Sequence, residues 1–287
     1  MVRLPQKLAV IVIHGLGRHK EDFADRFMIQ LKKRYADAAG INDPGNHLAI
    51  RPVHWAEILE VREERLKARL YGHNRLRYKL LRNYLIHYLA DAVAYQPLEV
   101  NDQIYRDIHA TISTALQRLT EEAGPEAPLC AISHSMGTVI ASNYFYDMQN
   151  ATRWKPDVLE PGSPLARGET LSLFYSCGTT LPLWSLRYRD FDRPIRVPAD
   201  AAYAAAKGIT GEWVNFYDRD DILGYPLRSI DPAYGRAVRE DVQINAGGML
   251  RSWNPFSHGG YFTNGSMLRR IAAGLVRTWR EANQQEG

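Results

Sequence analysis

The chain has 287 residues, of which 45% are hydrophobic and 24% are charged, and its formal net charge is +4. This length and composition are those of an ordinary globular protein with one large domain or two small ones. So small an excess of positive charge does not indicate a nucleic-acid partner.

The first apolar run, LAVIVI at residues 8–13, is continuous and rich in β-branched residues, which predicts a central strand of a parallel sheet. After it, strands and helices are expected to alternate. The expected elements are a helix at about 21–38, a strand at 47–55, a helical stretch from 56 to about 95, a helix at 105–122, a strand at 128–133, a helix at 136–148, strands at 170–178 and 213–218, and an amphipathic helix at 266–282. This alternation predicts an α/β fold with a doubly wound parallel sheet.

No internal repeat and no low-complexity linker divides the chain, so a single domain over residues 1–287 is the simpler prediction. Residues 56–100 are expected to be a helical insertion, with one weak point at the sequence YGHN. Residues 184–211 are expected to be a second insertion. Both insertions would lie over the edge of the sheet.

The two cysteines, Cys130 and Cys177, lie in apolar runs without the spacing of a zinc site or a disulfide framework. They are expected to be reduced and buried, which favours a reducing, cytoplasmic location. The apolar run near the N-terminus is too short to span a membrane and leads into HGLG rather than a cleavage site. We therefore expect neither a signal peptide nor a transmembrane helix.

The sequence AISHSMG, residues 131–137, lies between an expected buried strand and an expected helix. A nucleophile turn of the G-x-S-x-G type requires this context, because a sharp strand-to-helix turn exposes the serine hydroxyl at the carboxyl ends of the strands. Ser135 is the candidate nucleophile. Gly137 and Ser133 would be the small residues that keep strand and helix apart, with Ser133 in place of the usual glycine. The alternative is a serine that caps a helix.

The sequence HGLG, residues 14–17, follows the first strand directly. An oxyanion hole needs two backbone N–H groups that converge on a developing negative charge. We expect one from Met136, the residue after the candidate nucleophile, and the other from Leu16. Glycines would let this loop approach the substrate closely.

A serine nucleophile needs a base, and histidine is the usual one near neutral pH. His258, in the sequence NPFSHGGYF, is the only histidine after Ser135, and it lies in an expected loop before the last helix. The sequence WVNFYDRDDILGYPL places three carboxylates after a late strand. Asp221 is the preferred acid because it precedes an apolar turn, Asp218 is the second choice and Asp220 the third. The acid would hold the histidine tautomer and stabilise the imidazolium.

At this point the sequence resembles the α/β-hydrolase family, and in particular little-characterised bacterial serine esterases or lipases. The pieces that carry the resemblance are VIVIHGLG, AISHSMGTVIASNY, CGTTLPLW, WVNFYDRDDILGYPL and SHGGYF, spread over residues 8–262. In such relatives the acid of a DPVAYPL-like run is the triad carboxylate, and that run aligns on Asp221. Ser133 is the departure from the family pattern.

The resemblance implies a serine hydrolase that cleaves carboxylic esters through a Ser-Asp-His triad and an acyl-enzyme, with a small-molecule ester substrate and no metal or cofactor. Two alternatives stay open. The protein could be a lipid acylhydrolase or thioesterase, or it could be a non-catalytic binding protein of the same fold.

Several other residues are expected to line the substrate pocket, namely His14, Gly15, His134, Thr179 and Leu181, with Trp184 beside them. For His14 a structural role in its loop is the stronger alternative. His54 and Trp55 end a strand, and core packing is at least as good an explanation for them as a pocket.

The insertion carries many cations between Arg62 and Arg82, interleaved with leucines and tyrosines. A packed helix pair with a solvated basic face is one explanation. The other is a cap that shields the site and makes peripheral contact with an anionic membrane.

Overall fold

The computed structural model of the chain describes residues 5–15, 22–72, 74–86, 91–96, 103–150, 162–187, 191–247 and 255–284. Its strands are β1 (Leu8–Ile13), β2 (Leu48–Val53), β3 (Leu129–His134), β4 (Leu171–Cys177), β5 (Glu212–Tyr217) and β6 (Glu240–Gln243). Its α-helices are α1 (Asp22–Ala39), α2 (Glu57–Gly72), α3 (Lys79–Leu85), α4 (Asp91–Ala94), α5 (Gln103–Ala123), α6 (Met136–Asn150), α7 (Leu181–Ser185), α8 (Ala201–Ala206), α9 (Pro232–Ala237) and α11 (Gly265–Gln284). Two 3-10 helices, η1 (Pro44–Asn46) and η3 (Pro255–Thr263), complete the elements named here.

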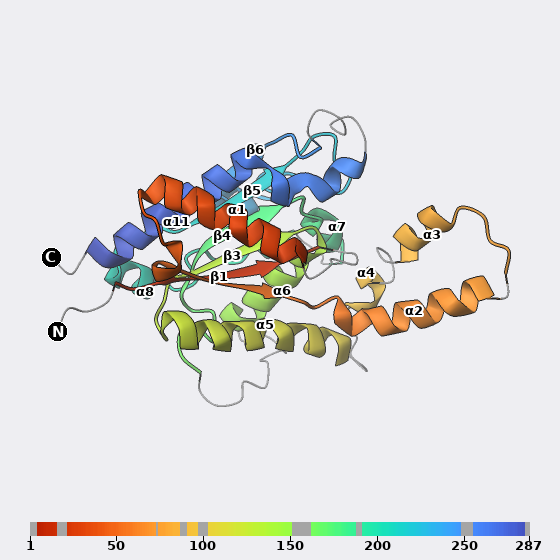
Figure 1. Cartoon of the computed structure of the whole chain (residues 1–287), viewed down its shortest axis with the longest axis horizontal. Helices are drawn as coiled ribbons and strands as arrows, with labels where there is room; N and C mark the ends of the chain where they lie inside the picture. The colour runs from red at the N-terminus through yellow and green to blue at the C-terminus, as the bar shows by residue number, and fades with distance from the viewer. Residues whose placement is uncertain are drawn as a thin grey trace.

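The strands form one sheet in the order β2-β1-β3-β4-β5-β6, and every neighbouring pair is parallel. Helices cover both faces of this sheet (Figure 1). The predicted α/β fold is confirmed, and the six-stranded parallel sheet flanked by helices is consistent with an α/β-hydrolase fold. The five predicted strands and the helices predicted at about 21–38, 105–122, 136–148 and 266–282 are present, with their ends shifted by no more than two residues.

The alternation of side chains along β1 sorts the core into two layers. Leu8, Val10 and Val12 pack on the face covered by α1 and α11. Ala9, Ile11 and Ile13 pack on the opposite face, against residues of α5 and α6. Because both faces are covered, β1 is apolar at every position, as the continuous run LAVIVI indicates.

The strand order places a functional site at one end of the sheet. From β1 the chain moves outward to β2, whereas from β3 it moves in the other direction, to β4 and beyond. The loops after β1 and β3 therefore diverge, and ligands of open α/β sheets bind in the crevice at such a switch point, outside the carboxyl ends of the strands. The sequences HGLG and SHSMG follow these two strands.

The helical stretch expected from residue 56 to about 95 is not continuous. It consists of α2, α3 and α4, and the first break follows Gly72, at the weak point YGHN. Figure 1 shows α2 and α3 extending well beyond the rest of the molecule, on the side toward which the strands point. Their role as a cap stays a prediction, as do the single domain and the second insertion.

β6 and the short helices α7, α8 and α9 were not predicted from the sequence. β6 lies at one edge of the sheet, is four residues long and has no buried residue. At the other edge, β2 contains Pro52. No helix in the described part of the chain is long and apolar enough to cross a bilayer.

Candidate active site

Ser135 is the single residue between the end of β3 and the start of α6. Its φ of 54° lies in the left-handed region, which is uncommon for a residue other than glycine and is typical of strained functional turns. The turn is fixed from both sides. The Ser135 N–H donates to Cys177 O at 3.0 Å, and the Thr138 hydroxyl donates to Ser135 O at 2.6 Å.

Two glycines make this turn possible. A Cβ on Gly15 would lie 2.5 Å from the Cβ of Ser135, so the loop after β1 passes directly over the nucleophile turn. A Cβ on Gly137 would lie 2.2 Å from His14 O, a backbone atom that cannot move aside cheaply. Glycine is therefore required at both positions by close backbone approach.

Ser133 occupies the position where the motif usually has its first glycine. It is completely buried in β3, between Ile13 of β1 and Ser176 of β4. Its hydroxyl makes no hydrogen bond to the described residues. A side chain of this size therefore fits the space, and no contact of its hydroxyl with the described residues assigns it a role.

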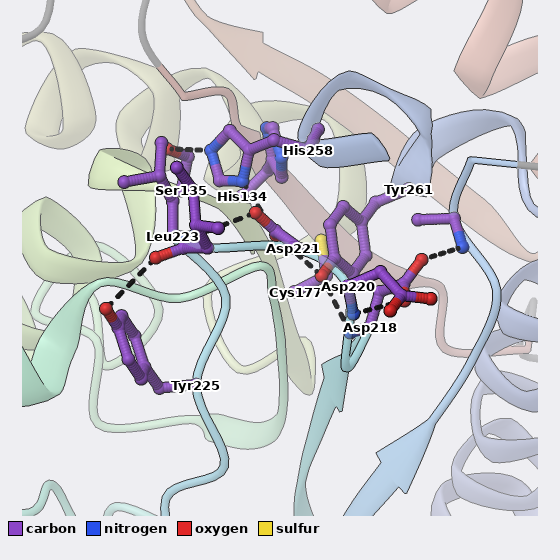
Figure 2. A network of polar contacts seen from close by, with 12 residues as sticks. His134, Ser135, Cys177, Asp218, Asp220, Asp221, Leu223, Tyr225, His258 and Tyr261 are labelled. Atoms are coloured by element: carbon purple, nitrogen blue, oxygen red, sulfur yellow. Dashed lines mark hydrogen bonds and ion pairs between the residues drawn. The ribbon is translucent and has the colours of Figure 1, made fainter. Parts of the chain in front are cut away.

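The Ser135 hydroxyl faces His258, as Figure 2 shows. The distance from Ser135 Oγ to His258 Nε2 is 2.6 Å, and His258 Nδ1 lies 2.8 Å from Asp221 Oδ2. Since a carboxylate only accepts hydrogen bonds, Nδ1 carries the proton in this arrangement and the lone pair of Nε2 faces the serine. His258 was expected in a loop, and this expectation is wrong, because the residue lies in η3.

Asp221 is held in a definite orientation. Its side chain is fully buried, its Oδ1 accepts from Leu223 N at 2.9 Å, and its Oδ2 accepts from the Tyr261 hydroxyl at 2.8 Å as well as from His258. Burial and the neighbouring Asp221 carboxylate raise the pKa of Tyr261 well above its ordinary value, so the hydroxyl keeps its proton. The same hydroxyl accepts from Asp218 N at 2.9 Å.

The other two carboxylates of the acidic turn lie elsewhere. Asp218 is buried, but it accepts from Ala246 N at 2.7 Å and from Asp220 N at 3.0 Å. The Asp220 side chain is 43% exposed and lies near Arg219. Of the three candidates, Asp221 is the one in contact with His258 (Figure 2).

Tyr261 was not among the residues singled out from the sequence. It follows His258 by three positions in the same 3-10 helix, where residues i and i+3 lie on one face. That spacing is the signal that could have identified it. The ring is fully buried, and it packs so closely on Gly178 that a Cβ there would lie 2.7 Å from it.

The expected donors of an oxyanion hole lie on the two loops of the switch point. Met136 is the first residue of α6, and the helix itself does not use the N–H groups of its first turn. Leu16 lies outside the described residues. Gly15, directly before it, is in place beside Ser135.

The remaining pocket candidates are largely enclosed. His14 is 5% exposed, with Nδ1 at 2.7 Å from Gly15 O, and the Trp55 indole donates to His14 O at 2.9 Å. Thr179 is buried, and its hydroxyl lies 2.5 Å from that of Thr138. Leu181 lines a hollow between α6 and α7 together with Trp184.

His134, the last residue of β3, is buried and contacts the backbone of His258, the candidate base. Its Nε2 is 2.8 Å from His258 O, and a carbonyl only accepts, so Nε2 carries a proton. The contact ties η3 to the end of β3.

The chemistry of the neighbouring groups is restricted. Burial, and to a lesser extent Asp221, raises the pKa of Cys177 well above the ordinary value, so this thiol stays protonated. Both cysteines are free and buried, as expected. The described residues contain no group of three or more histidines, cysteines or carboxylates that could hold a metal ion.

No protein-family model matches the sequence, and no curated protein is significantly similar to it. Among solved structures, the esterase domain of a Rhodothermus marinus protein is similar, with 9% identity, a TM-score of 0.36, and coverage of 98% of this chain and 88% of that chain. A structure described with the metagenome-derived lipolytic enzymes LipS and LipT has 13% identity, a TM-score of 0.36, and coverage of 84% of each chain. Similarity at this level is too low to transfer a function, so a functional conclusion depends on the geometry of the site.

Proposed function

We propose that the protein is a serine hydrolase of carboxylic esters, with Ser135 as nucleophile, His258 as general base and Asp221 as the triad acid. The observation that carries the proposal is the continuous chain of contacts from Ser135 Oγ to His258 Nε2 at 2.6 Å and from His258 Nδ1 to Asp221 Oδ2 at 2.8 Å. Its place in a strained strand-to-helix turn supports the same conclusion.

In the first half of the reaction, the oxygen of Ser135 attacks the ester carbonyl while His258 Nε2 takes the hydroxyl proton. The tetrahedral intermediate collapses with cleavage of the ester C–O bond. The leaving alcohol receives its proton from His258, which returns to the neutral form. Asp221 keeps Nδ1 protonated and stabilises the imidazolium that exists between the two proton transfers.

In the second half, His258 takes a proton from water, and the resulting hydroxide attacks the acyl group on Ser135. Collapse of this intermediate returns the proton to the serine oxygen and releases the carboxylic acid. The backbone N–H of Met136 would stabilise the negative oxygen in both halves, and the proposed second donor is Leu16. One such donor is worth about 10²–10³ in kcat.

A fluorophosphonate probe tests the proposal directly, because the activated serine oxygen displaces fluoride and becomes covalently phosphonylated. Intact-mass analysis should show one adduct per chain, on Ser135. The adduct should be lost in Ser135→Ala and His258→Ala and should persist in Ser133→Ala, the matched control in the same turn. Folded wild-type protein without an adduct would leave the non-catalytic binding protein as the better explanation.

Substrate class is tested separately. p-Nitrophenyl esters of rising acyl length, compared with acyl thioesters, distinguish a short-chain esterase from a lipid acylhydrolase or thioesterase. The ratio of kcat/KM between substrates is the measurement, because it reports differential transition-state binding.

A further inference from the structure

The outer part of the helical insertion concentrates positive charge. We define the arm as residues 57–72 and 74–86, which contain α2 and α3. From Arg65 to Arg82 the sequence has seven lysines and arginines and no aspartate or glutamate. The whole arm has eight lysines and arginines and four glutamates, and its net charge of +4 equals that of the entire chain, so the rest of the chain is neutral overall. The positive charge is thus local to the arm.

Most of these cations face solvent and are not paired with an acidic residue in the part of the chain that the structure describes. Six of the seven are exposed, namely Arg65, Arg69, Arg75, Arg77, Lys79 and Arg82. Among the described residues, none of the six forms an ion pair, whereas Lys67 lies 3.1 Å from Glu64. A helix pair built for intramolecular stability would be expected to intersperse charges of both signs.

The arm also exposes apolar side chains among its cations. The exposed fractions are 41% for Leu66, 57% for Leu81 and 74% for Tyr78. Tyr78 is held at the start of α3 with a φ of 58° in the left-handed region. Tyrosine with an exposed ring beside lysine and arginine is typical of residues that lie at a membrane–water interface.

The arm has internal order and a defined place. The Tyr71 hydroxyl donates to Asn83 Oδ1 at 2.7 Å, and Lys79 Nζ lies 5.7 Å from the centre of the Tyr71 ring, which ties α3 to α2. At its base, Leu59 is buried in the core. α2 begins two residues after Trp55, whose indole bonds to His14 O beside the candidate active site. Figure 1 shows the arm on the side toward which the strands point.

We infer that the arm docks the protein on an anionic lipid bilayer, with its cations on the headgroups and Leu66, Tyr78 and Leu81 at the interface. A nucleic acid would bind the cations through its phosphates but would offer no apolar environment to the exposed leucines. A bilayer offers both anionic headgroups and an apolar interior. Docking does not depend on the chemistry at Ser135. That a docked molecule takes its ester substrate from the bilayer rests on the proposed function.

Vesicle flotation of the full-length protein tests docking, with phosphatidylcholine vesicles compared with vesicles that also contain phosphatidylserine. Binding should require phosphatidylserine and weaken as salt is added, because salt screens charges at exposed sites. Each lysine or arginine near an anionic surface strengthens binding to the membrane. The triple variant R65Q/R75Q/R77Q, which removes three of them, should therefore bind about a hundredfold more weakly.

Two further variants sharpen the test. K33Q/R118Q/R236Q removes the same charge from exposed positions on the body, in α1, α5 and α9, and should bind close to wild type. L66S/L81S keeps every cation and should bind several-fold more weakly, because it removes the apolar contact. Equal binding to both vesicle types, or an equal loss in the body and arm variants, would overturn the proposal. Arm-dependent binding to RNA with no binding to vesicles would overturn it as well.

Docking and hydrolysis fail separately in this design. Ser135→Ala should bind vesicles like the wild type, and R65Q/R75Q/R77Q should hydrolyse p-nitrophenyl acetate in solution like the wild type. Binding to vesicles without fluorophosphonate labelling would contradict only the proposed serine hydrolase chemistry. Labelling without binding to anionic vesicles would contradict only the proposed docking surface.

Discussion

The Tyr261 hydroxyl donates a hydrogen bond to Asp221 Oδ2, the same carboxylate oxygen that contacts His258, the candidate base. Both side chains come from one turn of η3, because a 3-10 helix has three residues per turn and His258 precedes Tyr261 by three. One short segment therefore supplies the base and also the group that fixes the orientation of the acid. This arrangement makes Tyr261 a positioning residue.

Tyr261→Phe should lower kcat by about tenfold, because Asp221 loses a donor that fixes its orientation and so holds His258 less well in the reactive position. KM should change little. Without the Tyr261 donor, more negative charge on Asp221 faces His258, which favours the imidazolium, so the acid limb of the kcat/KM profile should move to higher pH. Loss of packing alone would not move this limb.

The matched control for this change is Tyr225→Phe. The Tyr225 hydroxyl bonds to Ile222 O at 3.0 Å and does not reach the carboxylate, as Figure 2 shows. Its pH profile should coincide with that of the wild type. Coincident profiles for all three proteins would show that Tyr261 has no influence on the base.

Replacement by asparagine should affect turnover differently at the two buried aspartates of the acidic turn, Asp218 and Asp221. Asp221→Asn should lower kcat by about 10⁴, because the amide favours the wrong tautomer of His258. Asp218→Asn should keep most of the activity and destabilise the fold by about 1–3 kcal/mol, since Asp218 accepts from the buried N–H of Ala246. Turnover and urea unfolding of each variant give the comparison. The reverse pattern would assign the acid to Asp218.

Ser133 and Gly137 flank the nucleophile and should differ sharply in how well they tolerate substitution by alanine. Ser133→Ala removes a buried hydroxyl that has no partner among the described residues, so it should keep full activity and be neutral or more stable by about 1 kcal/mol. Gly137→Ala places a Cβ 2.2 Å from the carbonyl oxygen of His14 and should abolish activity or folding. Melting temperature and turnover are the measurements. A catalytic loss in Ser133→Ala would give its hydroxyl a function.

Glu212, at the opposite end of the sheet from the site, should make stability depend on pH. Burial alone would raise its pKa, but hydrogen bonds from Arg270 and Tyr175 outweigh burial and lower the pKa to about 2. The stabilisation is fully present above pH 4.5, the ordinary pKa, and is lost as pH falls toward 2, at up to about 1.4 kcal/mol per pH unit.

Glu212→Gln should therefore cost up to about 3 kcal/mol of unfolding free energy at neutral pH, because it removes the buried charge that the half-buried Arg270 and Arg277 contact. The difference from wild type should narrow at pH 3. Glu240→Gln is the control, because Glu240 is 52% exposed and lies 3.9 Å from the same Arg270, where an ion pair is worth about 0–1 kcal/mol. A difference that stays constant with pH would contradict the assigned ionisation.

The parts of the fold that could be predicted are those in which many residues repeat one pattern. β1 shows six apolar residues in succession, and α11 shows an apolar stripe over twenty residues. β6 shows neither, because its sequence EDVQ is short and mostly polar and contains no buried residue. α7, α8 and α9 have at most six residues each, which is too few for a helical period to be visible.

The contacts of the candidate site were predictable only in part. The order of Ser135, Asp221 and His258 along the chain indicated which groups could meet, and the structure places them in contact. The bond of His134 to the backbone of His258 depends on two segments 124 residues apart, and no local pattern contains that information. Their catalytic roles stay predictions until the chemistry is measured.

The two edges of the sheet bear on how the chain behaves beside other copies of itself. Pro52 in β2 removes a donor from one edge. At the other edge, Asp241 of the short strand β6 is already engaged, because it accepts from Asn215 and from the N–H groups of Leu227 and Arg228. Short edge strands with prolines and inward-turned charges resist the addition of a further strand. These features disfavour aggregation by addition of a strand from another copy at either edge of the sheet.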